Sequence, residues 1–442
     1  MRLLNLDGED RRRGSSSLHV HIRIIKGLRP SITAGDEVVT KALVVHHRWG
    51  YGGGVTVFYY TIKALADAGF DVTISTVDPP DPRSYLDVVG EPLPSSAKFV
   101  RALNVDVRML TIYKPLISLR YAYRSPFDVI VVTHGYLYTL SGGVKAPIVY
   151  YMHFPAVLIA DRLWNPEIAK YELRGPLSSG FKSFVASIPW WLYFQPYRLL
   201  AGRLYRRLVE SISRILVNST YTLKAFKYSL LRYADLDLED VEELLSRTRI
   251  LHPPLPRAWE LLKLRGNLRL PCVASIGRFS SEKRYDLVLD VARLMPEVTF
   301  IVAGGVYGRA SRAYYQWVRS RAPGNVMVKA NIPAHVKNLI LSKCTVYLHT
   351  MVGEHFGISP LEALAAGMTP VVPEKSGTWT DVCNNGEYCY GYRRPEPKEI
   401  AEAVEKALEK PLGAPREHVE RFSPERFTKG MVAVVEEVLS GR

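Results

Sequence analysis

Two glutamates eight positions apart, Glu354 and Glu362, lie in the stretch of the sequence whose residue types and spacing best suit ligand binding or catalysis. Glu354 lies in a loop flanked by glycines, and Glu362 follows Ser359 and Pro360, where we expect a helix to begin. Serine is a favoured N-cap, proline suits the first helical position, and Glu362 would be the capping-box acid. The free N–H groups of such a helix point at the loop and favour an anion there. A well-capped helix after a strand is the simpler alternative.

Other positions carry groups that suit a phosphate or a sugar. Gly53 and Gly54 follow a predicted strand and open a helix, so backbone N–H groups can approach a phosphate without obstruction by a Cβ. Arg278 and Lys283 follow a later strand and could neutralise a departing diphosphate. His153 ends a further strand and could bond to a sugar. Taken singly, these residues are also compatible with a turn, two solvated cations and a structural histidine.

The elements that must position these residues are strands alternating with helices, which predict parallel sheets with right-handed crossovers. A first series of strands covers residues 41–47, 70–77, 129–133, 148–153 and 215–218. A second covers residues 273–277, 299–304, the stretch around 326, 345–352 and 369–373, with helices from residue 285 and over 334–343. We predict a basic arm (1–37), a first domain (38–252), a second domain (253–423) and a final helix (424–442) that packs back on the first domain.

Composition narrows the classes of protein. The length of 442 residues exceeds what one core usually holds, and 47% hydrophobic with 23% charged residues excludes a disordered or fibrous chain. The net charge of +15 indicates an anionic partner. The four cysteines lack C-x-x-C spacing, which indicates neither a zinc site nor a disulfide framework.

Residues 1–14 lack the apolar core of a signal peptide, and no run approaches the roughly 20 apolar residues of a membrane span, so we expect a cytoplasmic protein. Only two glutamines occur, a depletion that favours a thermophilic source. In that case a Cys383–Cys389 disulfide becomes conceivable inside the cell.

Aromatic and basic residues gather in residues 182–207, which include Trp190, Trp191, Arg198 and Arg206, and again in residues 108–124. Aromatics that favour headgroup depth, next to cations that attract anionic lipid, predict a segment at a membrane interface. A buried helical hairpin with a basic exposed face is the alternative.

In their order along the chain, these motifs resemble those of the retaining glycosyltransferases of the GT-B fold, family 4. The resemblance covers roughly residues 40–440 and rests on the strand and glycine loop, His153-x-Pro155, G-R-x-x-x-E-K (277–283) and E-x7-E closing on A-A-G (354–367). Within the family it is closer to the α-1,2-mannosyltransferases that extend the dolichol-linked oligosaccharide, through residues 151–155, 217–219 and 354–358.

The resemblance implies two Rossmann-like, doubly wound parallel-sheet domains facing a central cleft, with the acceptor bound by the first (38–252) and the nucleotide-sugar donor by the second (253–423). It implies transfer of a hexose, with mannose favoured, from a nucleoside diphosphate to a lipid-linked glycan with retention at the anomeric carbon. The donor favoured is GDP-mannose, no cofactor or obligatory metal is expected, and the enzyme would sit peripherally on the cytoplasmic membrane face. The implied catalytic residues are His153, Glu354, Arg278 and Lys283, and the implied donor-binding residues are Gly53, Gly54, Glu362, Phe356, Gly357 and Ile358.

Other functions remain open at this stage. A GT-B enzyme could act on a soluble sugar or compatible solute, and a catalytically dead sugar-binding relative would keep the same motifs. The positive charge also suits nucleic acid, although no recognition helix, RNP-type strand or zinc spacing accompanies it. The D-x-D at Asp235 and Asp237 could bind a metal, but it precedes an amphipathic helix and we interpret it as the acidic start of that helix.

Overall fold

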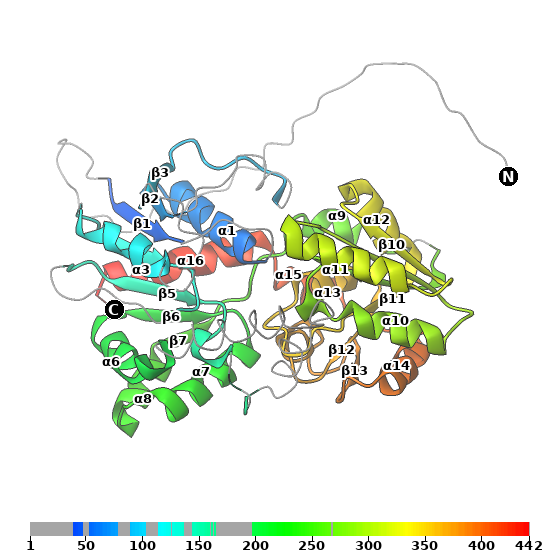
Figure 1. Ribbon diagram of the computed structural model, residues 1–442. Coiled ribbons are helices and arrows are strands. Elements are labelled where there is room, and N and C mark those ends of the chain that lie inside the picture. Colours follow the sequence, from blue (N-terminus) through cyan, green and yellow to red (C-terminus); the bar gives the residue numbers. More distant parts are fainter. Residues whose placement is uncertain are drawn as a thin grey trace, which may run out of the picture. The chain divides into compact units, whose positions relative to one another are not determined.

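The computed structural model describes residues 39–46, 53–77, 89–102, 114–124, 126–136, 144–159, 161, 163–164, 197–266 and 268–441. These residues form two parallel β-sheets flanked by helices (Figure 1). The predicted arm (1–37) and the two tryptophans, Trp190 and Trp191, lie outside the described residues.

The first sheet has seven strands in the order β3-β2-β1-β4-β5-β6-β7, and every neighbouring pair is parallel. Its central strands are apolar and buried along their whole length, as expected of a sheet covered on both faces. The strands are β1 (Lys41–Val45), β2 (Asp71–Thr76), β3 (Lys98–Arg101), β4 (Val129–Val132), β5 (Ile148–Met152), β6 (Arg214–Val217) and β7 (Thr248–Ile250).

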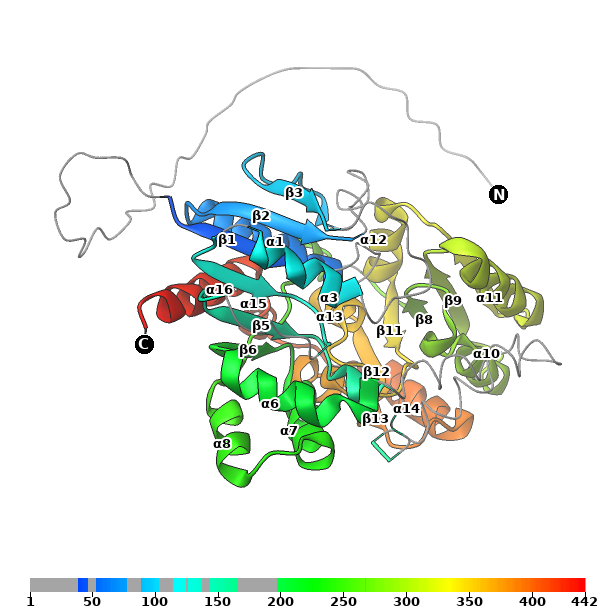
Figure 2. The ribbon, with the colours of Figure 1, turned by 60° about the vertical axis from the view of Figure 1, so that its left-hand side comes forward.

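Two hydrophobic cores cover the two faces of this sheet. One contains residues of α6, α7 and α8, which pack together in Figure 2. The other contains α1 and the last helix of the chain, α16, which lies beside α1 in Figure 1. The helices are α1 (Gly53–Asp67), α3 (Lys114–Leu119), η1 (Arg120–Tyr123), η2 (Ala156–Leu158), α6 (Ala201–Ser211), α7 (Thr220–Tyr233), α8 (Leu238–Ser246) and α16 (Pro424–Leu439).

The second sheet has six parallel strands in the order β10-β9-β8-β11-β12-β13. One core joins it to α10, α11 and α14, and another joins it to α9, α12, α13 and α15. The strands are β8 (Leu270–Ile276), β9 (Thr299–Gly304), β10 (Val326–Ala330), β11 (Cys344–Leu348), β12 (Thr369–Pro373) and β13 (Tyr390–Tyr392). The helices are α9 (Ala258–Leu262), η3 (Ser281–Lys283), α10 (Tyr285–Leu294), α11 (Gly308–Arg321), α12 (Ala334–Lys343), α13 (Ile358–Ala365), the π-helix η4 (Thr378–Val382), α14 (Pro397–Glu409) and α15 (Arg416–Glu420).

In each sheet the strand order reverses once, between β1 and β4 and between β8 and β11. Ligands of open α/β sheets usually bind at the carboxyl ends of the strands beside such a reversal. Gly53 follows β1, Lys283 follows β8 and Glu354 follows β11, each in the connection between its strand and the next long helix, so three predicted site residues lie beyond the carboxyl ends of strands at the two reversals. The predicted fold of two Rossmann-like parallel-sheet domains is confirmed.

The predicted start of the helix after Glu354 is wrong. Helix α13 begins at Ile358, and its N-cap is Gly357 with φ of 96°. A positive φ costs glycine little, so the chain turns into the helix before Ser359 can cap it. Glu362 is therefore not a capping-box acid, and its Oε1 instead accepts a bond from Lys337 Nζ at 2.8 Å.

The expectation that the cysteines form no disulfide framework is also wrong. Cys272 of β8 and Cys344 of β11 form a disulfide between neighbouring strands, with Cα atoms 4.8 Å apart. Cys383 and Cys389, considered above, form a second, with Cα atoms 5.3 Å apart. The first pair is 72 residues apart, and only sheet pairing brings its Sγ atoms within bonding distance, which no local spacing reveals.

Candidate active site

The first-domain side of the site consists of a histidine facing the start of a helix. A Cβ placed on Gly54 would lie 3.8 Å from Nε2 of His153, and this Nε2 is buried without a hydrogen-bond partner among the residues that the structure describes. Burial, with a contribution from nearby His46 and His355, lowers the pKa of His153 to about 3. The imidazole is therefore neutral at pH 7, and its Nε2 can bond to a ligand that enters beside Gly54.

Two helix starts meet at Gly53. A Cβ on Gly53 would lie 2.9 Å from Cδ1 of Ile358, so the N-terminus of α1 lies against the N-terminus of α13. Both helices present unpaired N–H groups and the positive ends of their dipoles there. The arrangement suits an anionic group. The sequence predicts such a group at Gly53 and Gly54 and, separately, at the start of the helix in the E-x7-E segment.

Glu354 is held by two groups of the second domain. Its Oε2 lies 2.7 Å from Lys283 Nζ and 3.3 Å from His349 Nε2, and the Glu354 and Lys283 side chains are only 15% and 20% exposed. Burial opposes ionisation, but Lys283 and His349 hold the pKa of Glu354 well below its usual value. Thr350 Oγ1 donates to the carbonyl of Lys283 at 2.6 Å, which ties the loop after β11 to the turn after β8.

The remaining predicted polar residues differ in their surroundings. Glu362 is paired with Lys337, whereas Arg278 is 51% exposed with its Nη2 3.5 Å from a Glu282 oxygen. The charge of Lys283 is already matched by Glu354, so Arg278 is the more available of the two predicted diphosphate cations.

The loop that carries Glu354 is fixed by its neighbours on both sides. The ring of His355 stacks on Phe154 with centroids 4.0 Å apart, which joins the two motifs that sequence reasoning treated separately. Gly377 N donates to the Glu354 carbonyl at 2.7 Å. Phe356 is buried in a core, so it can approach a donor only through its backbone.

His349 and Lys337 were missed by the sequence reasoning. His349 is a polar residue directly after the apolar strand β11, and polar groups at strand ends often line ligand sites, so this position offered a signal. Lys337 lies inside the predicted helix α12 among ordinary surface residues. Nothing local marks its contact with Glu362.

Two of the four predicted membrane-interface residues can be placed, and both have protein partners. Arg198 donates to the Tyr233 hydroxyl, and Arg206 lies 2.8 Å from the Asp235 carboxylate. Every helix in the described ranges is too short or too polar to cross a membrane.

The D-x-D carboxylates also have local roles. Asp237 is the N-cap of α8 and accepts the N–H of Asp240 at 2.9 Å, which confirms its place at the acidic start of that helix. Among the residues with described positions, no group of three or more His, Cys, Asp or Glu is arranged to hold a metal ion.

Comparison with known families gives two matches that lie side by side along the chain. Residues 51–228 match the model of a family described as Glycosyltransferase Family 4, and residues 263–426 match that of Glycosyl transferases group 1. The first contains Gly53, Gly54 and His153, and the second contains Lys283 and both glutamates.

Similar proteins include a GDP-Man:Man(3)GlcNAc(2)-PP-Dol alpha-1,2-mannosyltransferase of Dictyostelium discoideum, 25% identical over 336 residues. An alpha-1,3/1,6-mannosyltransferase of Homo sapiens is 29% identical over 271 residues. The matches cover 69% and 54% of this chain but only 61% and 63% of the two relatives' own lengths.

Solved structures with the same fold include a sucrose-phosphate synthase of Thermosynechococcus elongatus, with a TM-score of 0.64 and 16% identity over 91% of this chain and 100% of that one. Another is HepE of Anabaena in complex with UDP and glucose, with a TM-score of 0.54 and 14% identity over 91% of this chain and 99% of that one.

Proposed function

The chain belongs to the family 4 glycosyltransferases of the GT-B fold, and we propose that it transfers mannose from GDP-mannose to a hydroxyl of a lipid-linked glycan, with retention at the anomeric carbon. The names of the mannosyltransferases above support the choice of sugar and acceptor. The observation that best supports the donor site is the meeting of two helix N-termini at Gly53 and Ile358, with neutral His153 beside Gly54. The Lys283–Glu354 pair lies in the loops before α10 and α13.

In this proposal the two glutamates hold different parts of one donor. Glu362 accepts the ribose hydroxyls and Glu354 accepts hydroxyls of the sugar, as an acidic residue does for ribose in dinucleotide folds. The diphosphate lies against the starts of α1 and α13, with Arg278 and Lys283 supplying further positive charge.

The chemistry needs charge stabilisation at the leaving group. As the bond between anomeric carbon and diphosphate breaks, negative charge grows on the phosphate oxygens, and fixed N–H dipoles and cations stabilise it. The leaving phosphate takes the proton of the attacking acceptor hydroxyl, which joins the anomeric carbon on the face that the diphosphate leaves. Glu354 is paired with Lys283 and lies 3.3 Å from His349 Nε2, so we assign it to positioning the sugar.

A thermal-shift screen of the wild-type chain against GDP, UDP and ADP and their hexose conjugates tests the donor assignment. A ligand that binds only the folded state stabilises it by about 2.7 kcal/mol at about 100 times its Kd. We expect the largest rise in melting midpoint with GDP-mannose and a smaller rise with GDP. No shift with any of the six nucleotides would contradict a nucleotide-sugar transferase.

We further propose that α6 rests on an anionic membrane that carries the acceptor. Its exposed face carries Arg203, Arg206 and Arg207, while Tyr205 faces the core. Leu199, just before the helix, is 82% exposed. Exposed leucine beside several arginines suits the headgroup region of an anionic bilayer, which also fits the net charge of +15.

Vesicle co-sedimentation with phosphatidylglycerol tests this surface. Reversing two charges with R203E/R207E should weaken binding at least about tenfold, because each basic residue near the surface contributes about 1 kcal/mol. The matched control R309E/R312E makes the same change at two exposed arginines of α11 and should leave binding close to wild type. Equal vesicle binding by the two variants, or no vesicle binding by the wild type, would contradict the assignment of α6 to a membrane surface.

A further inference from the structure

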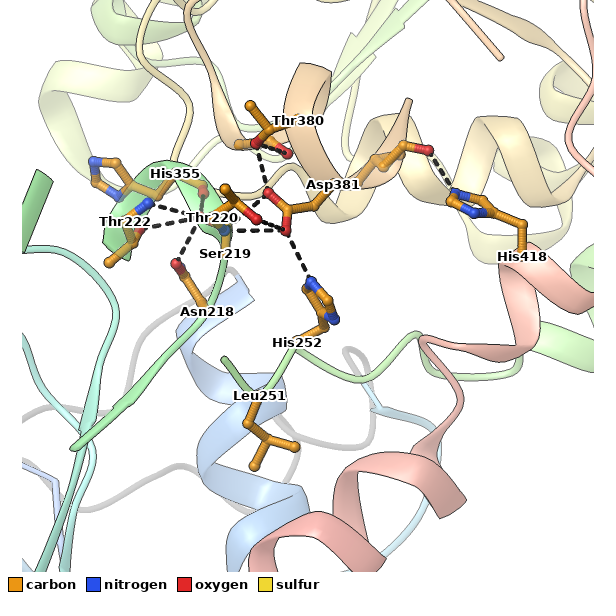
Figure 3. Close-up of polar contacts among 12 residues, drawn as sticks. Asn218, Ser219, Thr220, Thr222, Leu251, His252, His355, Thr380, Asp381 and His418 are labelled. Atoms are coloured by element: carbon orange, nitrogen blue, oxygen red, sulfur yellow. Dashed lines mark hydrogen bonds and ion pairs between the residues drawn. The ribbon is translucent and has the colours of Figure 1, made fainter. Parts of the chain in front are cut away.

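A buried carboxylate of the second domain receives hydrogen bonds from the first domain and from the segment between them. The side chain of Asp381, in η4, is only 4% exposed. Both its oxygens lie 3.0 Å from Thr220 N, and it accepts the Thr220 hydroxyl at 2.9 Å and the Thr380 hydroxyl at 2.6 Å. His252 Nε2 lies 2.9 Å from Oδ1 (Figure 3).

The surroundings keep Asp381 ionised. Burial opposes the charge, but the bonds from His252, Thr380 and Thr220 lower the pKa of Asp381 below its usual value. Thr220 is the first residue of α7, so the carboxylate also lies at the positive end of that helix dipole. Removing such an acceptor leaves several buried donors unsatisfied.

This carboxylate lies where the chain passes between the two domains. The chain leaves the first sheet after β7 and enters the second at β8, through His252 and Leu255, and it returns after α15 through Phe422 to α16. The two passages touch, because Leu255 N donates to the Phe422 carbonyl at 2.7 Å and the His252 and Phe422 rings are 5.1 Å apart. Any movement of one domain against the other must bend the chain here.

The same network reaches the loop of Glu354. Ser219 is the N-cap of α7 and accepts Thr222 N at 3.0 Å. Its hydroxyl lies 2.5 Å from the carbonyl of His355, which it faces in Figure 3. Asp381, by holding the start of α7, therefore supports a contact to the residue next to Glu354.

We propose that Asp381 is a positioning residue for the transfer reaction. It holds in place the pivot, by which we mean the two chain passages between the domains, and through Thr220 and Ser219 it fixes the position of the loop that carries Glu354. The contacts that support this inference do not depend on the substrate, but its consequence for donor binding rests on the proposed function. Asp381 has no contact with the reacting atoms in this account.

The expected effect on binding differs between the two ligands. If the Glu354 loop shifts, the sugar loses its acceptor while the nucleoside, held at Glu362, does not. Asp381→Asn keeps the shape and removes the charge. We expect it to weaken GDP-mannose binding at least tenfold and to change GDP binding less than threefold. A loss of general stability alone would weaken both ligands alike.

The control is Thr380→Val, which removes one bond to the same carboxylate without touching the first domain. It should leave both affinities within twofold of wild type. Equal losses for GDP and GDP-mannose in Asp381→Asn, or no loss in either, would overturn the positioning role. If Asp381→Asn does not fold, His252→Asn provides a second variant. It should also weaken GDP-mannose binding more than GDP binding, by a smaller factor.

Hydrogen exchange of the unliganded chain tests the pivot without any substrate. Asp381→Asn should accelerate exchange at least tenfold in three separated segments: 216–224, 250–255 and 353–358. Thr380→Val should accelerate none of them. Faster exchange confined to residues 376–386 would contradict the pivot, and this result is independent of whether the wild type binds a nucleotide. If no nucleotide binds in the thermal-shift screen but exchange accelerates in all three segments, the proposed function is refuted while the role of Asp381 at the pivot stands.

Discussion

Replacing Glu354 with glutamine is expected to destabilise the fold by about 2–4 kcal/mol, because it leaves the half-buried Lys283 ammonium without its partner. It should also lower donor turnover by roughly 100-fold, since the amide cannot accept sugar hydroxyls as strongly as a carboxylate does. Urea unfolding and steady-state transfer rates measure the two effects.

The effect on stability has a defined dependence on pH. The pKa of Glu354 is depressed in the folded state, so its contribution is complete above the ordinary glutamate value of 4.5 and is lost as the pH falls toward the folded value. The difference in free energy of unfolding between wild type and Glu354→Gln should therefore be full at pH 7 and shrink below about pH 4.5.

A second substitution separates stability from function. Adding Lys283→Met to Glu354→Gln removes the unpaired cation and should recover most of the lost stability. It should recover no activity, because both proposed donor contacts are then gone. If the double variant regains turnover, or if Glu354→Gln alone keeps more than half of it, Glu354 does not hold the sugar.

Replacing Gly54 with alanine is expected to leave the fold intact while reducing GDP affinity at least tenfold. The new methyl group would make an ordinary contact, 3.8 Å from His153 Nε2, and alanine in a helix is more favourable than glycine by up to about 1 kcal/mol. The same methyl group occupies the space in front of the buried Nε2 where we place the diphosphate. Thermal unfolding and calorimetric titration with GDP measure the two quantities.

Gly413→Ala is the matched control, because no atom of the described part of the chain lies within 4 Å of the added Cβ and the Gly413 backbone is not left-handed. It should change neither stability nor GDP affinity. Unchanged GDP affinity in Gly54→Ala would mean that the phosphate does not approach the start of α1.

The elements of the fold were largely predictable from local pattern. Apolar runs with flanking turns located β9, β12 and α12 to the residue and located the start of α16, because each is bounded by proline, glycine or a charged turn. The predicted start of α13 was wrong, because the local sequence is compatible both with a left-handed turn at Gly357 and with a cap at Ser359.

The partners of the site residues were not predictable from the sequence. Glu354 and Lys283 are 71 positions apart, and Asp381 and Thr220 are 161 apart. Several acids and cations of the second domain have similar local surroundings, so only the packed sheets decide which of them pair. The disulfide between β8 and β11 could not be predicted for the same reason, because its two cysteines are 72 positions apart and meet only in the folded sheet.

The central claim, that Glu354 and Glu362 hold the sugar and the nucleoside of one donor, is tested most directly by calorimetric titration of GDP and GDP-mannose into the wild type, Glu354→Gln and Glu362→Gln. Glu354→Gln should weaken GDP-mannose at least tenfold and spare GDP, whereas Glu362→Gln should weaken both by a similar factor. Equal effects of the two substitutions on both ligands, or stronger loss of GDP in Glu354→Gln, would contradict the account.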